Sequence, residues 1–219
     1  MINEAIILCG GQGTRLRPLT NDNPKALIEV GGKPMLQWQL EWLKKNGVKK
    51  IVLACGYMSD KISEYMENSG VEFKIAEENE PLGTGGAIRN ALQFVDGERF
   101  IVANVDDIND LNVSKAAAVG ENVICLAHPK LPFGAVMFDW NNIVKDFVEK
   151  PTLRDIWVNM GVSVLAKKDL LPLLAEKCSL EMDAFPKLVE ARKLKSYMHN
   201  GFWHTINAVK DIDDFKKPW

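Results

Sequence analysis

The feature that most constrains the fold is a short apolar run, Ala5 to Cys9, that breaks directly into a glycine-rich loop. A strand that is apolar at every position is typical of a parallel sheet covered on both faces. The loop contains Gly10, Gly11 and Gly13, and without Cβ atoms its backbone can turn tightly and bring N–H groups against an anion. This order of strand and loop predicts an α/β fold with a phosphate-binding turn.

Basic residues follow the glycines. Arg15, Arg17 and Lys25 add cations to the backbone dipoles of the loop. Arginine can bind two phosphate oxygens at once, whereas lysine acts as a movable point charge. A polyphosphate ligand needs both kinds of group, so the pattern favours nucleotide binding over the simpler alternative, a glycine turn with exposed basic residues.

The loop matches neither standard nucleotide fingerprint. A Walker loop has Lys and Ser or Thr directly after its last glycine, but Gly13 is followed by Thr14 and Arg15. The dinucleotide fingerprint fails because Leu16 occupies its third glycine position.

The first half of the chain alternates between expected strands and expected helices. The strands are residues 5–9, 50–55, 71–76 and 100–104, and the helices are residues 34–46, 59–68 and 84–95. Such alternation predicts a mostly parallel sheet with helices on both faces, and ligands that gather at the carboxyl ends of the strands.

The second half is less regular. Its expected strands are residues 122–127, a hairpin of 134–138 with 143–147, and 159–165, 194–198 and 202–206; its expected helices are residues 168–177, 185–192 and 211–216. No repeat or linker separates the halves, so we expect one domain over residues 1–219, with a boundary between the halves near residue 110.

Composition excludes several classes of function. The formal net charge is −2 at pH 7, which gives no electrostatic footprint for nucleic acid or an anionic membrane. The four cysteines form no C-x-x-C pair and are expected to be reduced thiols of a cytoplasmic protein. No targeting or membrane-spanning segment is expected.

Two acidic clusters follow expected strands. Asp106 and Asp107 come directly after residues 100–104, and carboxylates at that edge of a sheet suit Mg²⁺. Asp107 and Asp110 are expected to be ordinary turn acids. Glu78 precedes a turn and a helix N-terminus, which faces whatever ring or phosphate lies there.

The run from Gly10 to Lys25 resembles the signature G-G-x-G-T-R-L-x-P-L-T, followed by P-K, of the sugar-phosphate nucleotidylyltransferase family. Residues 78–86 are similar to its E-x-E-P-L-G-T-x-G segment, which implies that Glu78 reads the base. A carboxylate only accepts hydrogen bonds, so it suits guanine better than uracil. The resemblance implies a three-layer Rossmann-like nucleotidyltransferase fold with a mostly parallel mixed sheet, a nucleotide half of about residues 1–110 and an acceptor-sugar half of about 111–219. It places the nucleotide on Leu8, Gly10, Gly11, Gly13, Thr14, Arg15, Lys25, Glu78, Pro81, Gly83 and Thr84.

The resemblance extends to the acceptor half and to catalysis. Residues 134–136, 149–151 and 159–161 look like the family's G-x-V, E-K-P and N-x-G elements. It implies that the sugar 1-phosphate contacts Gly134, Glu149, Lys150 and Asn159. It also implies that Arg15, Lys25, Asp106 and Lys150 are catalytic and that Asp106 holds Mg²⁺.

The chain departs from the family pattern at two positions. Val105 stands where the family has glycine, and its Cβ can narrow the approach to the nucleoside. Thr205 stands where the family has a second metal-binding aspartate, so the metal is expected to rely on Asp106, nucleotide phosphates and water. His199 and His204 are expected to have packing roles, since Mg²⁺ does not favour imidazole.

The implied reaction transfers a nucleoside monophosphate, with GTP as the favoured donor, to a sugar 1-phosphate and releases pyrophosphate. The motifs look most like the branch that acts on manno-configured heptose or mannose 1-phosphates. A uridylyltransferase for a hexose or amino-sugar 1-phosphate is the closest alternative, and a catalytically weak subunit that binds nucleotide sugars is an alternative of another class. Trp219 and the C-terminal helix are expected either to form a homodimer contact or to join the core.

Overall fold

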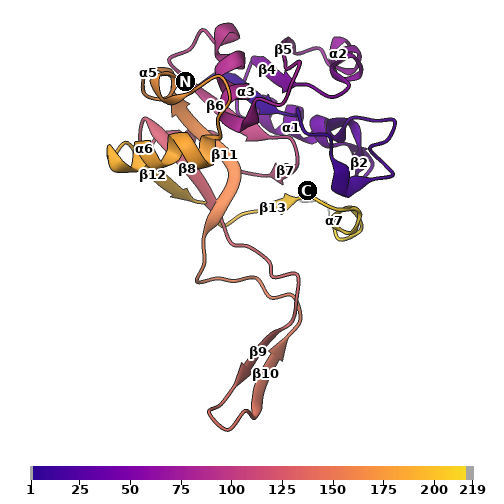
Figure 1. The fold of residues 1–219 in the computed structure, drawn as a ribbon, viewed down its shortest axis with the longest axis vertical. Helices are drawn as coiled ribbons and strands as arrows, with labels where there is room; N and C mark the ends of the chain where they lie inside the picture. The colour runs from indigo at the N-terminus through magenta and orange to yellow at the C-terminus, as the bar shows by residue number, and fades with distance from the viewer. Residues whose placement is uncertain (1, 216–219) are drawn as a thin grey trace.

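A computed structural model of the chain describes residues 2–215. Its centre is a seven-stranded sheet in the order β12-β8-β11-β6-β1-β4-β5 (Figure 1). The strands are β1 (Glu4–Leu8), β4 (Lys50–Cys55), β5 (Glu72–Glu77), β6 (Arg99–Asn104), β8 (Asn122–Ala127), β11 (Val158–Ala166) and β12 (Leu194–Met198). Only β11 runs antiparallel to its neighbours, which confirms the mostly parallel mixed sheet.

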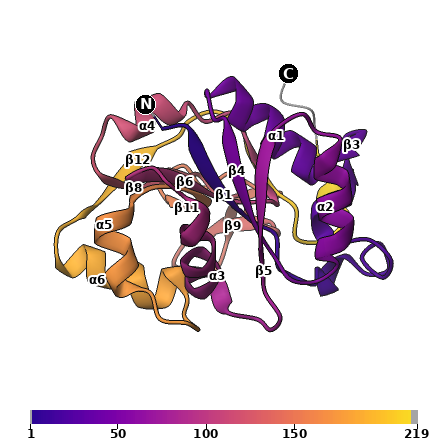
Figure 2. The ribbon, with the colours of Figure 1, turned by 90° about the horizontal axis from the view of Figure 1, so that it is seen from above.

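Helices cover both faces of this sheet (Figure 2). The helices on one face are α1 (Met35–Lys45), α2 (Ser59–Glu67) and α4 (Val113–Ala117), and those on the other are α3 (Gly83–Ala91), α5 (Lys167–Leu170) and α6 (Phe185–Glu190). In β1, Ala5 and Ile7 join the first layer and Ile6 joins the second. The uniformly apolar first strand therefore serves two cores, as expected of a central parallel strand.

Two short strand pairs lie outside the main sheet. Strand β7 (Asp107–Asn109) pairs antiparallel with β13 (Trp203–Thr205), which brings the late part of the chain back to the end of β6. Strand β2 (Glu29–Val30) pairs with β3 (Lys33–Pro34). Neither β7 nor α4 was predicted from the sequence.

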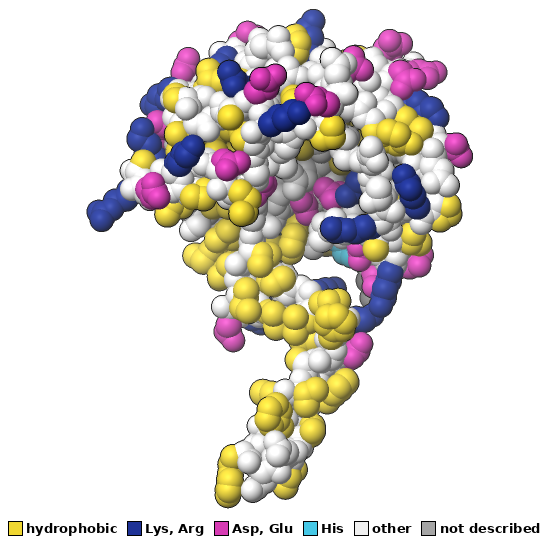
Figure 3. Space-filling view, in the orientation of Figure 1, with side chains coloured by type: hydrophobic (Ala, Val, Ile, Leu, Met, Phe, Trp, Pro, Cys, Tyr) yellow, Lys and Arg dark blue, Asp and Glu magenta, His cyan; other side chains and the backbone are white. Residues whose placement is uncertain are grey.

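A third pair, β9 (Ala135–Phe138) and β10 (Val144–Val148), forms a two-stranded ribbon that projects away from the rest of the molecule (Figures 1 and 3). The hairpin prediction is thus confirmed in position. The space-filling view shows that hydrophobic side chains cover much of the ribbon.

Two predicted helices differ from the structure. The expected helix at residues 168–177 is wrong in its second half, because α5 ends at Leu170 and a 3₁₀ turn, Leu171–Leu173, follows. Pro172 has no backbone N–H with which to continue an α-helix. The terminal helix α7 is Val209–Asp213, earlier than residues 211–216. Trp219, for which a dimer contact was one prediction, lies outside the described residues.

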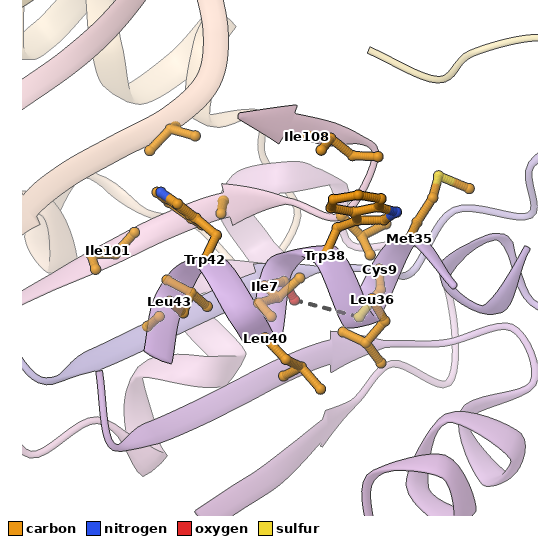
Figure 4. Packing of buried hydrophobic residues seen from close by; sticks show 14 of the residues in the cluster. Ile7, Cys9, Met35, Leu36, Trp38, Leu40, Trp42, Leu43, Ile101 and Ile108 are labelled. Carbon is orange, nitrogen blue, oxygen red and sulfur yellow. Dashed lines mark hydrogen bonds between the residues drawn. The ribbon is translucent and has the colours of Figure 1, made fainter. Parts of the chain in front are cut away.

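Helix α1 packs against the central sheet beside the end of β1, where the glycine loop begins (Figure 4). Its Leu36 and Leu43 are fully buried, and the close-up places them beside Ile7 and Cys9 of the first strand segment. The indole N–H of Trp42, which is also on this helix, donates to the Leu111 carbonyl at 2.8 Å. Helix α1 is therefore packed against the first strand segment and bonded to the residue two positions after β7.

None of the helices within residues 2–215 is both long and apolar enough to cross a bilayer.

Candidate functional site

The candidate site lies at the carboxyl ends of β1, β4 and β5. Gly10 follows β1, Gly56 follows β4 and Glu78 follows β5. A Cβ on Gly10 would lie 3.0 Å from Glu78 Oε1, and a Cβ on Gly56 would lie 3.2 Å from the Glu78 carbonyl oxygen. Glycine at both positions therefore lets the Glu78 carboxylate lie against the first turn of the loop. The sequence analysis did not identify Gly56. The available signal was its position directly after an apolar strand, which resembles the position of Gly10 after β1.

Glu78 is held in place by the backbone. Its N–H donates to the Cys55 carbonyl at 2.7 Å, and its Oε2 accepts from the Leu82 N–H at 3.2 Å. Burial raises the pKa of the Glu78 carboxyl above its ordinary value, while the Leu82 N–H opposes that rise. The predicted base-reading acid is thus a half-buried acceptor with one oxygen already anchored.

The glycine loop folds back on itself and brings Lys25 to the glycines. Gly13 has a φ of 60°, a left-handed conformation that favours glycine. Its carbonyl accepts from Thr20 Oγ1 at 2.9 Å, and a Cβ on Gly13 would lie 3.2 Å from Lys25 Cβ. Thr20 is buried, so this hydroxyl fixes the return of the chain.

Lys25 then reaches the acid loop after β6. Its Nζ lies 2.5 Å from Asp106 Oδ2, and the two side chains are 16% and 17% exposed. The Val105 N–H donates to the Leu8 carbonyl at 3.2 Å, which ties the acid loop to the end of β1. The structure thus brings together the lysine and the acid that the sequence placed in one site.

Arg15 lies on the outer side of the same loop. It belongs to the 3₁₀ turn Thr14–Leu16, which is anchored by the fully buried Leu16. The Arg15 side chain is exposed and forms no ion pair with any residue of the described part of the chain. Its guanidinium is therefore available to a ligand at the mouth of the loop.

Asp107 is not the ordinary turn acid that was predicted. It is 6% exposed, and its carboxylate accepts from Asn104 Nδ2 at 2.9 Å and from Trp203 Nε1 at 3.0 Å. Burial first, and then the charge of Asp106, raise the pKa of Asp107 to about 7. Gly161, at φ +74°, provides the room, because a Cβ there would overlap Asp107 Oδ2.

Thr205 lies beside this acid pair. It is the direct partner of Asp107 in the β7–β13 ladder, and the Ile206 N–H donates to the Asp106 carbonyl at 2.9 Å. Its Oγ1 accepts from Asn207 Nδ2 at 3.0 Å. The residue that replaces the family's second aspartate is thus next to the acids and already hydrogen-bonded.

Helix α1 supports the acid loop through Gln39, which the sequence analysis did not identify. Its Nε2 donates to the carbonyls of Val105, at 3.3 Å, and Asp107, at 2.9 Å. Gln39 is buried on the apolar face of a helix, and that misplaced polar residue was the available signal. Val105 is 2% exposed and packs in the core, so its side chain is directed into the protein.

The glycines at the start of α3 serve a packing role. A Cβ on Gly83 would lie 2.6 Å from the Cys178 carbonyl oxygen, and one on Gly86 would lie 2.3 Å from the carbonyl oxygen of Glu176. The backbone around Cys178 therefore occupies the space that a side chain at position 83 would need. The contact of Gly83 with a nucleoside stays a prediction. Thr84 Oγ1 accepts from the Leu180 N–H at 2.9 Å, which fixes the same contact. Pro81 is exposed before this helix.

The acceptor elements gather at the base of the projecting ribbon. A Cβ on Gly134 would lie 2.5 Å from the Phe147 ring and 3.0 Å from Glu149 Oε2. The Leu131 N–H donates to the Pro151 carbonyl at 3.0 Å, which joins the two chain segments at the base. Gly134 and Glu149 are thus adjacent, and their contact with a sugar stays a prediction.

Lys150 has a different neighbourhood from the other predicted catalytic residues. It has a φ of 48°, and its ammonium group lies near Lys210 and Asp214 at α7. Contact with the Lys210 amine and then the charge of Asp214 raise the pKa of Lys150, while Lys150 lowers the pKa of Lys210. Lys210 was not identified from the sequence, and two amines this close form a place for an anion.

Asn159 lies on the remaining acceptor element, near the acid loop. Its Oδ1 accepts from the Gly161 N–H at 3.0 Å, and β11, which carries both residues, pairs with β6. The Asn159 side chain is exposed at this edge of the sheet. The structure therefore brings Asn159 and the acids to one side, while Lys150 stands beside α7.

Several known proteins are similar to this chain in sequence. The chain is 39% identical over 222 residues to D-glycero-alpha-D-manno-heptose 1-phosphate guanylyltransferase of Campylobacter jejuni, and the match covers 97% of this chain and 98% of the relative. It is 32% identical to mannose-1-phosphate guanylyltransferase catalytic subunit beta of Drosophila melanogaster, with 95% of this chain and 60% of that protein covered.

Solved structures share the fold. HddC from Yersinia pseudotuberculosis complexed with GMP-PN has a TM-score of 0.76 and 29% identity, with 97% of each chain covered. A UDP-glucose pyrophosphorylase complexed with UDP-glucose, at 18% identity and a TM-score of 0.75, shows the fold alone. The model of the family described as nucleotidyl transferase matches residues 4–217. This chain therefore belongs to the nucleotidyl transferase family.

Proposed function

We propose that this chain transfers GMP from GTP to a sugar 1-phosphate, with release of pyrophosphate and formation of a GDP-sugar. The observation that carries the proposal is the contact of Lys25 with Asp106 beside the glycine loop, since it joins the expected phosphate-binding and metal-binding groups in one place. The relatives named as guanylyltransferases for heptose and mannose 1-phosphates support the same chemistry.

The reaction needs no covalent nucleophile on the protein. A phosphate oxygen of the acceptor attacks the α-phosphorus of GTP, the new P–O bond forms, and the bond to the β-phosphate oxygen breaks as pyrophosphate leaves. The attacking oxygen is already anionic at neutral pH. Catalysis therefore consists of holding the two phosphates in line and neutralising the charge that develops on the α-phosphate and the leaving group, which are the tasks proposed for Arg15 and Lys25.

The acid loop suits Mg²⁺. The two oxygens of Asp107 already accept N–H bonds, whereas Asp106 contacts Lys25 through Oδ2, so Asp106 is the carboxylate proposed to bind the ion. Thr205 lies opposite Asp107 in the β7–β13 ladder. One carboxylate with phosphate and water oxygens is a common Mg²⁺ environment, and the ion would supply further neutralisation of phosphate charge. Lys25 forms an ion pair with Asp106, and we propose that its ammonium turns to the triphosphate when nucleotide binds.

Glu78 is proposed to select the base. Its Oε1 lies against Gly10, and only Oε2 is committed to the Leu82 N–H. Guanine offers N1–H and the N2 amino group to a carboxylate, whereas the N3–H of uracil offers one donor. This difference favours GTP over UTP and leaves the uridylyltransferase as the second candidate.

The acceptor is proposed to bind between the base of the ribbon and α7. Glu149 would accept hydrogen bonds from sugar hydroxyls, and Lys150 would bind the acceptor phosphate, with Asn159 at the edge nearer the acids. A phosphate bound by Lys150 would also lie close to the Lys210 amine, whose contact favours the charged form of Lys150. A manno-configured heptose or hexose 1-phosphate is the proposed class of substrate.

The test is release of pyrophosphate. The protein is incubated with Mg²⁺, each of the four triphosphates in turn, and a panel of sugar 1-phosphates, with the Lys25→Ala variant as the inactive control. The proposal expects release with GTP and a manno-configured sugar 1-phosphate. Release with UTP and a gluco-configured acceptor would replace it with the uridylyltransferase, and nucleotide-sugar binding without release would replace it with the regulatory subunit.

We also propose that the protein acts in the cytoplasm. All four cysteines are free thiols, and Cys9, Cys55 and Cys125 are buried, which suits a reducing compartment. Neither nucleic acid nor a membrane is proposed as a partner.

A further inference from the structure

The ribbon formed by β9 and β10, which we call the arm and define as residues 133–148, has no partner element. Each of its strands pairs with the other strand alone among the described strands. Figure 1 shows the arm extending well beyond the body of the molecule. An isolated two-stranded ribbon is at best marginally stable in water, so such an arm needs a surface on which to pack.

One face of the arm is uniformly apolar. Phe138 pairs with Val144 and Val136 pairs with Phe147, so these four side chains share a face. An irregularity between Val144 and Asp146 shifts the register by one residue and keeps Phe147 on that face despite its odd spacing from Val144. The four side chains are between 46% and 66% exposed. We call this surface the apolar arm face.

The opposite face of the arm is mixed. Met137 is opposite Asp146 there, and Lys145 lies in the irregularity between the two register pairs. Lys145 Nζ forms an ion pair with Asp139 Oδ2 at 3.0 Å near the tip. Ala135 pairs with Val148 on this face too, so it is apolar toward the base of the arm and carries its charged groups toward the tip. The apolar arm face is therefore the face without charged side chains.

The arm carries a disproportionate share of the exposed apolar surface. Nine of the sixteen large hydrophobic side chains exposed in the described chain belong to it; they are Phe133, Val136, Met137, Phe138, Trp140, Ile143, Val144, Phe147 and Val148. Aromatic side chains offer about 150–250 Å² each, so the exposed parts of the four aromatic members alone, Phe133, Phe138, Trp140 and Phe147, amount to roughly 600 Å². The five aliphatic side chains add to this area. The largest apolar patch of a typical monomer is about 300–600 Å², and each partner in a standard interface buries about 800 Å².

We propose that the arm is a homodimerisation element and that its occupant is the apolar arm face of a second copy of this chain. Two ribbons with the same apolar face can pack face to face about a two-fold axis as a small four-stranded sandwich. The same patch then meets itself, and both ribbons obtain the second layer that each lacks. The apolar arm face supplies only part of the exposed apolar area of the arm, so an interface of standard size would extend from this face to the exposed side chains of Trp140 and Ile143 at the tip.

Charge favours a second copy over an anionic membrane. The arm has a single basic residue, Lys145, and it is already paired with Asp139. A ribbon that bound an anionic bilayer would need a cluster of lysines or arginines around its apolar face. The formal net charge of −2 also creates little repulsion between copies.

The first experiment is sedimentation equilibrium of the purified chain between 1 and about 100 µM, a range that spans ordinary dimer affinities. The proposal expects a dimer for the wild type and at least a tenfold weaker association for the double variant Phe138→Ser with Phe147→Ser. The matched control, Met182→Ser with Val189→Ser, removes two apolar side chains outside the arm that are at least 60% exposed, as Phe138 and Phe147 are, and it should remain dimeric. Circular dichroism checks that each variant keeps its fold.

A charge-pair experiment separates loss of an interface from loss of folding. Phe138→Lys and Phe138→Glu should each be monomeric alone because like charges would meet across the axis, and a mixture of the two should form a heterodimer. A wild type that is monomeric at the highest concentration would overturn the proposal. If that monomer also sedimented with phosphatidylglycerol vesicles, an anionic membrane would be the partner of the arm. So would a dimer that survives in the Phe138 and Phe147 double variant or in both charged variants alone.

Discussion

Lys25 Nζ and Asp106 Oδ2 are 2.5 Å apart although 81 positions separate the two residues in the chain. The contact forms because the glycine loop returns to its own start through Thr20 and Gly13, while the acid loop is tied to β1 through Val105. A cation from one loop and an acid from another therefore meet at the ends of two neighbouring strands. This is the edge at which doubly wound sheets bind ligands.

Replacing Lys25 with alanine should lower turnover by about two to three orders of magnitude, because one cation that stabilises developing phosphate charge is lost. The chain should still fold, since the lysine contributes to no hydrophobic core. The rate of pyrophosphate release measures the effect, and Lys44→Ala, an exposed lysine at the end of α1, is the control. Arg15→Ala should behave like Lys25→Ala. Turnover near that of the wild type in either variant would contradict the assigned roles.

Trp203→Phe should destabilise the fold by about 1–3 kcal/mol, the usual cost when a buried polar acceptor loses its donor. The indole Nε1 donates to Asp107 Oδ1 at 3.0 Å, and phenylalanine keeps the aromatic packing but not this bond. Urea unfolding gives the free energy. Trp140→Phe, at a side chain that is 92% exposed, is the matched control and should change it little. Equal free energies for the two variants would mean that the bond does not support the acid loop.

The contrast between Asp106 and Asp107 shows what the sequence can and cannot predict. The alternation of apolar runs located the strands well, and residues 50–55, 122–127 and 194–198 match their predicted bounds. Their burial is a local property of the run. The environment of Asp107 instead depends on β13, which arrives from nearly a hundred residues further along the chain, and no local pattern reports that pairing.

The same limit explains the glycines of α3 and the arm. The run from Gly83 to Gly86 predicted that another group comes close to this backbone. In the structure that group is the backbone around Cys178. The local sequence does not distinguish such a contact within the chain from a contact with a ligand. The hairpin was predicted from its two apolar runs. Its projection from the body was not, because alternation along a strand shows which residues share a face but not what covers that face.

The selectivity for GTP should depend on pH through Glu78. Burial raises the pKa of this carboxyl above its ordinary value, and the ionised form is the one that accepts from guanine. The interaction is therefore present above that raised pKa and is lost as the pH falls through it, at a higher pH than for an exposed glutamate. The ratio of the Kd for ATP to the Kd for GTP should therefore decrease as the pH is lowered from 7.5 to 5.

Using this ratio cancels the titration of the triphosphate, which both nucleotides share. Glu78→Gln should lower the ratio at pH 7.5 by about tenfold, the effect of losing roughly 1.4 kcal/mol of charge-assisted hydrogen bonding, and should make it independent of pH. Isothermal titration calorimetry measures both constants. A variant that keeps the pH dependence would show that another group reads the base.

Gly134→Ala should raise the KM for the sugar 1-phosphate and leave the KM for GTP unchanged. The added Cβ would lie 2.5 Å from the Phe147 ring and 3.0 Å from Glu149 Oε2, so one of these side chains must move. Gly120→Ala is the control, because its Cβ would meet only the flexible side chain of Lys195. Steady-state kinetics with each substrate varied in turn separates the two constants. If only the KM for GTP changed, the prediction would be wrong. Residues 134–149 would then belong to the nucleotide site and not to the acceptor site.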